Sequence, residues 1–157
     1  MTASPQAIPK AIHGTFTIDR VYDATPKRVF KAFSDPKSKA RWFSGPPDFH
    51  ELKREFDFRV GGQEILHGRS GPCGESLFVA RYHEIVPDQR LVYVYDMTSN
   101  GVFMSISLAT IELTPQGSKT ALRFTEQAVY VDGKDGTESR RHGTAELLDR
   151  IAQNLPD

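Results

Sequence analysis

Residues 82–130 read YHEIVPDQRLVYVYDMTSNGVFMSISLATIELTPQGSKTALRFTEQAVY and decide the fold. Apolar and polar side chains alternate along this stretch, which is typical of β-strands with one buried face. Short turns interrupt the alternation, and strands joined by such turns pair antiparallel, because parallel pairing requires a long crossover. The stretch therefore predicts the main part of an antiparallel meander, with strands over 75–86, 90–98, 102–113 and 119–130.

The sheet extends from this meander towards the N-terminus. Residues 14–23 (GTFTIDRVYD) alternate in the same way, and 50–60 and 63–67 are two further predicted strands. Gly61-Gly62 separates the last two, and we expect a turn with positive φ there, a backbone region that glycine tolerates best. A loop is predicted over 68–74. These segments predict a curved antiparallel sheet of six or seven strands.

Two short helices are expected between the first and second strands. Thr25-Pro26 and Asp35-Pro36 each place a capping side chain before a proline at the first helical position. The second helix should end near Trp42, because a Gly-Pro-Pro run follows. The first helix is expected to bury the apolar side chains Val29, Phe30 and Phe33.

A longer helix is predicted near the C-terminus. Asp135 and Glu138 resemble a capping box at its start, and Pro156 ends it. An antiparallel sheet with one apolar face must cover that face, and this helix is the obvious cover. The predicted fold class is α+β. The apolar stripe of the helix consists of Thr144, Leu147, Leu148, Ile151 and Leu155.

Composition places the chain among ordinary globular proteins. The 157 residues fit one domain, which we assign to 13–157 after a flexible tail over 1–12. Twenty basic and twenty acidic side chains give no net charge, which argues against nucleic-acid binding and leaves a homodimer open. A lone cysteine, Cys73, suits a reducing compartment. No apolar run could span or insert into a membrane, and residues 1–10 do not resemble a signal peptide, so we expect a cytoplasmic protein.

No motif of the sequence indicates a cofactor, a metal or a catalytic nucleophile. Gly61-Gly62 lacks a following helix, so it does not match a dinucleotide-binding loop. The five histidines do not show metal-ligand spacing, and no serine lies in a G-x-S-x-G elbow. We therefore expect neither a cofactor nor a metal. Arg140, Arg141 and His142 are interpreted as a solvated helix face.

Several polar side chains are expected to face the covered side of the sheet. By alternation Glu126 shares a face with Phe124, Tyr93 and Tyr95 share one with Leu91, Tyr82 shares one with Ala80, and His67 shares one with Ile65. Such groups could orient a ligand in an apolar cavity. The alternative is that the tyrosines are core residues with hydroxyls near the rim, and that Glu126 faces water. Trp42 is expected to pack at the cavity mouth.

Three stretches in this order resemble a known family. They are D-x-R-x-G-G at 57–62, YHEIVPDQRLVY at 82–93 and LATIELTPQGSKTALRFTE at 108–126. With the two capped prolines and Trp42 they are similar to the Activator of Hsp90 ATPase homologue 1-like (AHSA1-like) proteins of the START/Bet v 1-like (SRPBCC) superfamily. The resemblance implies a helix-grip fold with an internal cavity and no shared catalytic residues. Two positions depart from the family: Ala80 stands where glycine is frequent, and Thr144 stands where tryptophan is usual, which implies a roomier cavity.

These observations lead to one leading prediction and two alternatives. We expect the chain to bind a hydrophobic or amphipathic small molecule in a mostly apolar void of a few hundred cubic ångströms between the sheet and the last helix. An enzyme similar to polyketide cyclases or aromatases, using Glu126, Tyr82 and His67, is the second hypothesis, and an Hsp90 partner with a role in the stress response is the third. No residue is assigned as catalytic. The expected cavity residues are Trp42, His67, Tyr82, Tyr93, Tyr95, Phe124, Glu126, Thr144 and Leu148.

Overall fold

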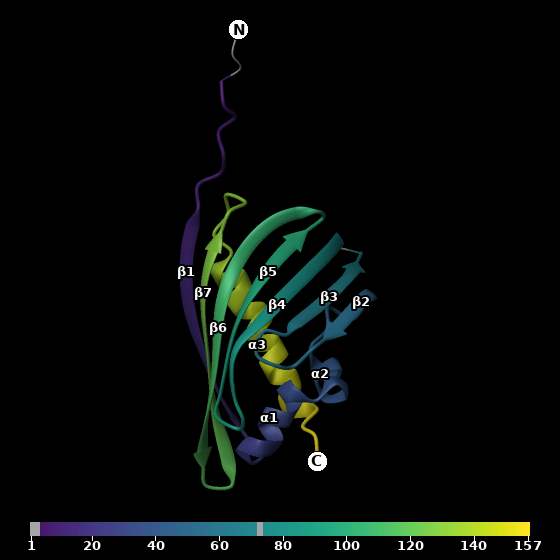
Figure 1. Cartoon of the computed structure of the whole chain (residues 1–157), viewed down its shortest axis with the longest axis vertical. Helices are drawn as coiled ribbons and strands as arrows, with labels where there is room; N and C mark the ends of the chain where they lie inside the picture. The colour runs from purple at the N-terminus through teal and green to yellow at the C-terminus, as the bar shows by residue number, and fades with distance from the viewer. Residues whose placement is uncertain (1–3, 72–73) are drawn as a thin grey trace.

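Residues 4–71 and 74–157 form a seven-stranded antiparallel sheet and three helices (Figure 1). The computed structural model describes residues 4–71 and 74–157, so Cys73 lies outside the described residues. The sheet order is β1-β7-β6-β5-β4-β3-β2, which places the first strand beside the last. The elements are β1 (Ile12–Tyr22), α1 (Pro26–Ser34), α2 (Pro36–Trp42), β2 (His50–Phe56), β3 (Gln63–Ser70), β4 (Gly74–Val86), β5 (Arg90–Ser99), β6 (Val102–Gln116), β7 (Lys119–Tyr130) and α3 (Thr137–Gln153).

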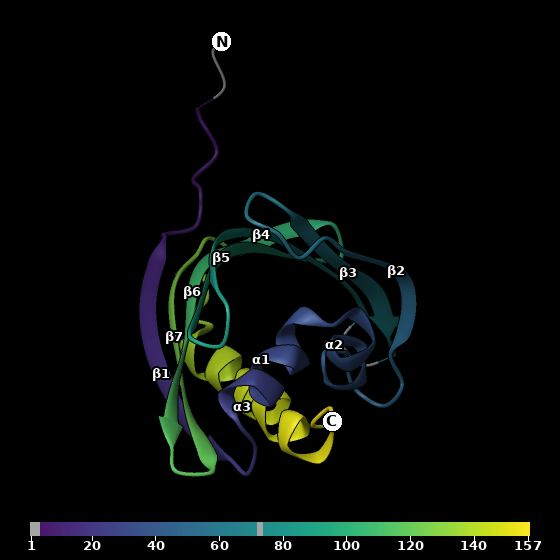
Figure 2. The ribbon, with the colours of Figure 1, turned by 60° about the horizontal axis from the view of Figure 1, so that its bottom comes forward.

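The sheet curves around the helices, which all lie on its concave side (Figure 2). We call this concave side the inner face. The α+β helix-grip architecture and the strand count are confirmed. α3 packs chiefly against β1, and it also contacts α2. The side of the inner face formed by β3–β5 is therefore filled largely by side chains from the sheet and from the segment around α2.

The predicted alternation is confirmed in β6 and β7. Ala109, Ile111 and Leu113 are buried on β6, and Leu122 and Phe124 are buried on β7. The register opposes Ala109 to Glu126, and Ile111 to Phe124, so these side chains share one face of the sheet.

Three strand ends differ from the prediction by three residues or more, and one of them is that of β6, which runs to Gln116 rather than to residue 113. β2 ends at Phe56 rather than at residue 60, because the chain turns immediately afterwards: the Gly62 amide donates to the Arg59 carbonyl at 2.8 Å. β3 continues to Ser70, where a loop was expected, because its pairing with β4 extends to Ser70 opposite Gly74. The Gly-Arg-Ser composition of 68–70 suggested a loop, but the ladder hydrogen bonds override it.

The two short helices begin as predicted. The Thr25 hydroxyl accepts a hydrogen bond from the Arg28 amide at 3.3 Å, and the Asp35 carboxylate accepts one from the Ser38 amide at 2.9 Å. A proline occupies the first turn of each helix. These caps satisfy amides that would otherwise lack partners at the helix starts.

The start and the stripe of α3 need correction. Gly136 is the N-cap and makes no side-chain cap bond. The Asp135 carboxylate instead accepts from the amide and the hydroxyl of Thr137, at 3.0 and 2.7 Å. Because Gly136 rather than Asp135 is the N-cap, the predicted capping box between Asp135 and Glu138 does not form. Leu155 lies beyond the helix end at Gln153.

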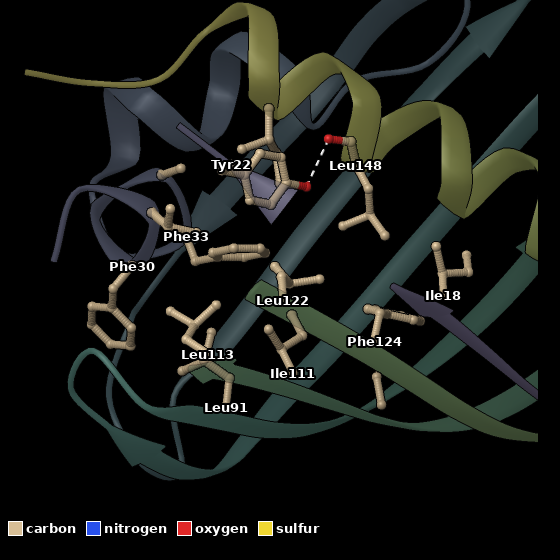
Figure 3. Close-up of a cluster of buried hydrophobic side chains, with 14 of the residues drawn as sticks. Ile18, Tyr22, Phe30, Phe33, Leu91, Ile111, Leu113, Leu122, Phe124 and Leu148 are labelled. Carbon is tan, nitrogen blue, oxygen red and sulfur yellow. Dashed lines mark hydrogen bonds between the residues drawn. The ribbon is translucent and has the colours of Figure 1, made fainter. Parts of the chain in front are cut away.

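A continuous apolar core lies between the inner face, α1 and α3 (Figure 3). Ile111 is 1% exposed and Leu122 is 1% exposed, and Phe33 from α1 lies against this cluster. The Tyr22 hydroxyl donates to the Leu148 carbonyl at 2.8 Å, which ties α3 to β1 in the core (Figure 3). Leu148 is therefore a core residue.

Gly61→Val should destabilise the protein by about 1–3 kcal/mol, the usual cost of holding a residue with a side chain at positive φ. Gly61 has φ 81°, and a Cβ added there meets no atom within 4 Å, so backbone strain alone carries the effect. Urea unfolding measures the change. Gly143→Ala, in an open position of α3, is the control and should be neutral or stabilising. Equal stability of Gly61→Val and the wild type would contradict the interpretation of this turn.

Candidate functional site

Three tyrosines form a row across the inner face. Tyr82 on β4 and Tyr93 and Tyr95 on β5 point to the same side, because residues two apart on a strand share a face and Tyr82 pairs with Tyr93. The ring centroids are 5.8 Å apart for Tyr82 and Tyr93 and 6.1 Å apart for Tyr93 and Tyr95. We call these three residues the tyrosine row. A buried carboxylate lies at each end of it.

The first carboxylate is Glu126 of β7, which is fully buried. One of its oxygens accepts a hydrogen bond from the Tyr95 hydroxyl at 2.6 Å. The other accepts from the Ser107 hydroxyl at 3.1 Å and from the Arg140 guanidinium at 3.3 Å. Arg140 also donates to the Ser105 hydroxyl at 2.8 Å and to the Tyr95 oxygen at 3.0 Å. Both carboxylate oxygens are therefore engaged by protein groups.

Arg140 corrects the interpretation of residues 140–142 as a solvated helix face. Its side chain is only 16% exposed and reaches under α3 to the sheet, whereas Arg141 and His142 are exposed. The sequence contained a signal for this: Arg140, Thr144 and Leu147 follow the helical spacing of the apolar stripe. A run of three basic residues hid that signal.

The electrostatics of this cluster follow from burial. Burial raises the pKa of Glu126, and the hydrogen bond from Tyr95, the positive charge of Arg140 and the hydrogen bond from Ser107 oppose that rise. Burial, followed by the negative charge of Glu126, raises the pKa of Tyr95. Tyr95 therefore stays protonated at neutral pH and acts as a hydrogen-bond donor to the carboxylate.

The second carboxylate is Glu64 of β3. Its side chain is 4% exposed, and one oxygen accepts from the Tyr82 hydroxyl at 2.7 Å and from the Lys39 ammonium at 3.1 Å. Burial and the charge of Glu64 raise the pKa of Tyr82. The Lys39 ammonium lies 4.7–6.0 Å from the centroids of four aromatic rings, which attract the cation through their electron-rich faces. These rings belong to Phe33, Trp42, Phe43 and Phe56.

Sequence reasoning missed Glu64 and Lys39. Ile65 and Leu66 are both apolar, so the pattern of β3 did not show which residues face inward, and a shift by one residue exchanges the two faces. Pairing with β4 decides it: Glu64 lies opposite Ala80, which is buried on the inner face. Lys39 could not be found, because an isolated lysine on a short helix is ordinarily exposed.

Tyr93 occupies the middle of the row and differs from its two neighbours. Its side chain is half-buried, and no residue in the described ranges 4–71 and 74–157 makes a hydrogen bond to its hydroxyl. Burial raises the pKa of Tyr93 well above its usual value, and Tyr95, Glu126 and Glu64 raise it further. Among the described residues the Tyr130 hydroxyl is the one fully buried side-chain polar atom without a partner, so the neutral Tyr93 hydroxyl keeps accessible surface, where water or a ligand can bond to it.

The structure places the other predicted residues as follows. His67 was expected in the cavity, but the pairing of β3 with β4 places it on the outer face of the sheet. There its Nε2 lies 2.6 Å from a carboxylate oxygen of Glu75. Tyr82 and Glu126 belong to two separate clusters, so they do not converge with His67 as an acid–base set. Phe124 is a buried core residue that stacks on Phe16, with ring centroids 6.0 Å apart. Thr144 is half-buried on α3.

Trp42 is a core residue rather than a residue of a cavity mouth. It is 4% exposed, its indole nitrogen donates to the Ala32 carbonyl at 2.8 Å, and its ring lies 5.1 Å from that of Phe33. These contacts fasten α2 to α1. They also fix one wall of the aromatic cage around Lys39.

The expected void behind the tyrosine row is occupied by side chains. Tyr82 is 2% exposed, Phe124 is 4% exposed and Glu126 is fully buried, so these three cannot line an open cavity in this conformation. A hollow of about 450 Å³ is present elsewhere, at the ends of β2–β5, and its lining includes Asp48, Arg69, Glu75 and Asn100. The roomier cavity expected from Thr144 is therefore not open behind the tyrosine row in this conformation.

Part of the inner face nevertheless remains partly accessible. Phe43, Phe58 and Phe78 are half-buried and join the tyrosine row into a continuous aromatic belt. Along this belt the ring centroids of successive pairs are 4.9–6.1 Å apart: Phe43–Phe78, Phe78–Tyr95, Tyr95–Tyr93, Tyr93–Tyr82 and Tyr82–Phe58. Met97 on β5 and Leu147 on α3 are half-buried beside it. Half-buried aromatic surface with few polar groups is typical of small-molecule sites.

Two other kinds of site are absent from the described residues. Within residues 4–71 and 74–157, no group of three His, Cys, Asp or Glu side chains is arranged to hold a metal ion. None of the helices in the same ranges has both the length and the apolar character needed to span a bilayer.

The stability of the Glu126 cluster should depend on pH. The raised pKa of Glu126 means that the folded state binds this proton more tightly than the unfolded chain does. The stabilisation is complete below the unfolded pKa, near 4.3, and is lost as pH rises through the folded pKa. Glu126→Gln cannot titrate, so the unfolding free energy of the wild type minus that of the variant should fall between pH 4 and pH 8. Urea titrations across this range measure it, and a difference that rises with pH would contradict the assignment.

Trp42→Ala should lower the unfolding free energy by about 3–5 kcal/mol, because it removes a buried indole and leaves a cavity. Trp42→Phe keeps an aromatic ring but loses the bond to the Ala32 carbonyl, so its loss should be smaller. Chemical denaturation of both variants provides the measurement. A loss below 1 kcal/mol for Trp42→Ala would show that the indole is not part of the core.

Comparison with known proteins gives a consistent result. The family model described as Activator of Hsp90 ATPase homolog 1-like protein matches residues 23–156. The crystal structure of Mll3558 from Rhizobium loti is 42% identical, with a TM-score of 0.86, and the match covers 93% of this chain and 99% of that one. An uncharacterized protein from Rhizobium leguminosarum is 34% identical, with a TM-score of 0.89 and coverages of 95% and 98%.

More distant structures share the fold alone. DynU16, a protein in the dynemicin biosynthetic locus, is 17% identical with a TM-score of 0.66, and the match covers 88% of this chain and 46% of DynU16. No curated protein matches the chain.

Proposed function

The chain belongs to the family of Activator of Hsp90 ATPase homolog 1-like proteins, and on this premise we propose that it binds an amphipathic small molecule on the inner face. The site is the half-buried part of the aromatic belt, with Tyr93 at its centre. Helix-grip folds of this family suit ligand binding, because a curved sheet and a helix enclose an apolar surface between them.

The unpartnered hydroxyl of Tyr93 is the observation that carries this proposal. A few polar groups on a mostly apolar surface are what usually orient a small-molecule ligand. In the row the hydroxyls of Tyr82 and Tyr95 have carboxylate partners, whereas that of Tyr93 has none among the described residues. A bound ligand would replace water at this accessible hydroxyl, and the surrounding half-buried rings would contact its apolar part.

An enzyme similar to polyketide cyclases is the second candidate. The raised pKa of Glu126 and the occurrence of DynU16 in a biosynthetic locus favour it. Both oxygens of Glu126 are already engaged by Tyr95, Ser107 and Arg140, however, so a catalytic role would require that this cluster opens. Binding without chemistry needs no such change, and we prefer it.

Three further assignments accompany the proposal. A cytoplasmic location is supported by the lone Cys73. A homodimer is compatible with the absence of net charge. Binding to Hsp90 is a prediction that rests on the family alone. Stoichiometric, salt-resistant capture of the chain by purified Hsp90 at micromolar concentration would make Hsp90 binding the preferred function over small-molecule binding and catalysis.

Nile red, a neutral apolar fluorescent probe, should bind the wild type with a dissociation constant in the micromolar range, or about 8 kcal/mol. Thr144→Trp should weaken this binding at least tenfold, because the indole would cover half-buried surface near Arg140 and Leu147 on the same side of α3. Fluorescence titration measures both. Thr144→Trp should also unfold at a higher temperature if the indole packs on that surface.

Glu146→Trp is the matched control for this experiment. It adds the same side chain to α3 at an exposed position, so Nile red should bind it as it binds the wild type. Absence of saturable binding to the wild type, or equal loss in both variants, would contradict a site on the inner face.

A further inference from the structure

We propose that the ligand is an uncharged, planar aromatic molecule that carries a carbonyl or hydroxyl group and bonds through it to Tyr93. This inference rests on the proposed function, because it names the chemical class that the same site would accept. It follows from three properties of the inner face: the balance of buried charge, the occupancy of the polar groups, and the shape of the apolar surface.

The buried charges beside the tyrosine row are already balanced. Glu126 pairs with Arg140, and Glu64 pairs with Lys39, with side chains 0%, 16%, 4% and 8% exposed in that order. Each pair is neutral as a unit. A charged ligand group at Tyr93 would lose its hydration and find no free counter-ion, which costs several kcal/mol per ion. Charge balance therefore selects an uncharged ligand.

The polar side chains near Tyr93 already make hydrogen bonds to one another. The Tyr82 and Tyr95 hydroxyls donate to Glu64 and Glu126, at 2.7 and 2.6 Å, and Ser107 donates to Glu126 at 3.1 Å. Tyr93 is the member of the tyrosine row with an unused donor. A phenol that stays protonated pairs best with a carbonyl or hydroxyl oxygen, so the ligand needs one such group at this point.

The apolar surface beside Tyr93 is built from rings. Phe43, Phe78 and Phe58 are half-buried and belong to the aromatic belt, whose ring planes meet at different angles: 66° for Phe43 and Phe78, and 75° for Phe58 and Tyr82. Within each of these pairs the two rings are far from parallel, and aromatic pairs favour offset-stacked and edge-to-face contacts. A planar aromatic ligand can make both kinds of contact.

Four naphthalenes of similar size test the inference. They are 2-ethylnaphthalene, 2-acetylnaphthalene, 2-naphthoate and 2-naphthylmethylammonium, measured by isothermal titration calorimetry at pH 7. Wild type should bind 2-acetylnaphthalene roughly threefold to tenfold more tightly than 2-ethylnaphthalene, the usual worth of one hydrogen bond. Both charged compounds should bind at least tenfold more weakly than 2-acetylnaphthalene.

Tyr93→Phe isolates the contribution of the hydroxyl. It should bind 2-ethylnaphthalene like the wild type but lose the preference for 2-acetylnaphthalene. Tyr130→Phe is the matched control: its hydroxyl is buried and has no partner within the described residues, so the preference should persist. Circular dichroism checks that both variants fold.

The outcomes separate this inference from the proposed function. If 2-ethylnaphthalene binds but a charged compound binds as tightly as the ketone, or Tyr93→Phe keeps the preference, the ligand class is wrong while binding on the inner face stands. If none of the four compounds binds and Nile red does not bind, both proposals fall.

Discussion

The pairing of β1 with β7 is the constraint on which the rest of the structure depends. Its register runs from Ile12 opposite Tyr130 to Tyr22 opposite Thr120, and it joins segments about one hundred residues apart. Closing such a long loop costs entropy that must be repaid by the contacts it allows. The pairing leaves β1 at the end of the sheet where α1 and α2 follow, and it gives α3 a surface to pack on, where Tyr22 bonds to Leu148 and Arg20 to Asp149.

The two buried ion pairs then set where the helices lie on that frame. The free energy needed to remove two charges from water offsets much of their mutual attraction, so buried ion pairs add little to the stability of the fold. Their effect is positional: Arg140 holds the first turns of α3 over β5–β7, and Lys39 holds α2 over β3. Each carboxylate also receives a tyrosine hydroxyl, so the same bonds that place the helices orient the tyrosine row.

The chemistry of the inner face follows from this arrangement. Because burial raises the pKa of Tyr82, Tyr93 and Tyr95, the row consists of neutral phenols at physiological pH. Two of them donate hydrogen bonds to carboxylates, and the hydroxyl of Tyr93 has no protein partner among the described residues. A mostly aromatic surface with one unused hydroxyl resembles the usual composition of small-molecule sites, where few polar groups fix orientation and apolar contact supplies affinity. This composition supports our proposal of ligand binding on the inner face.

The sequence by itself determined the α+β class, the meander and the two capped helices, because local alternation and caps are properties of neighbouring residues. Alternation also placed Tyr82 and Tyr93 on the inner face, but it left open whether Glu126 is buried or faces water, and the structure buries it. Only the tertiary structure decided the partners. His67 was placed on the wrong face because Ile65 and Leu66 are both apolar and the register with β4 selects between them. Glu64, Lys39 and Arg140 became site residues because segments distant in the chain meet on the inner face. A buried charge is tolerated only where an oppositely charged side chain packs beside it, and the local sequence does not show which distant residue does so.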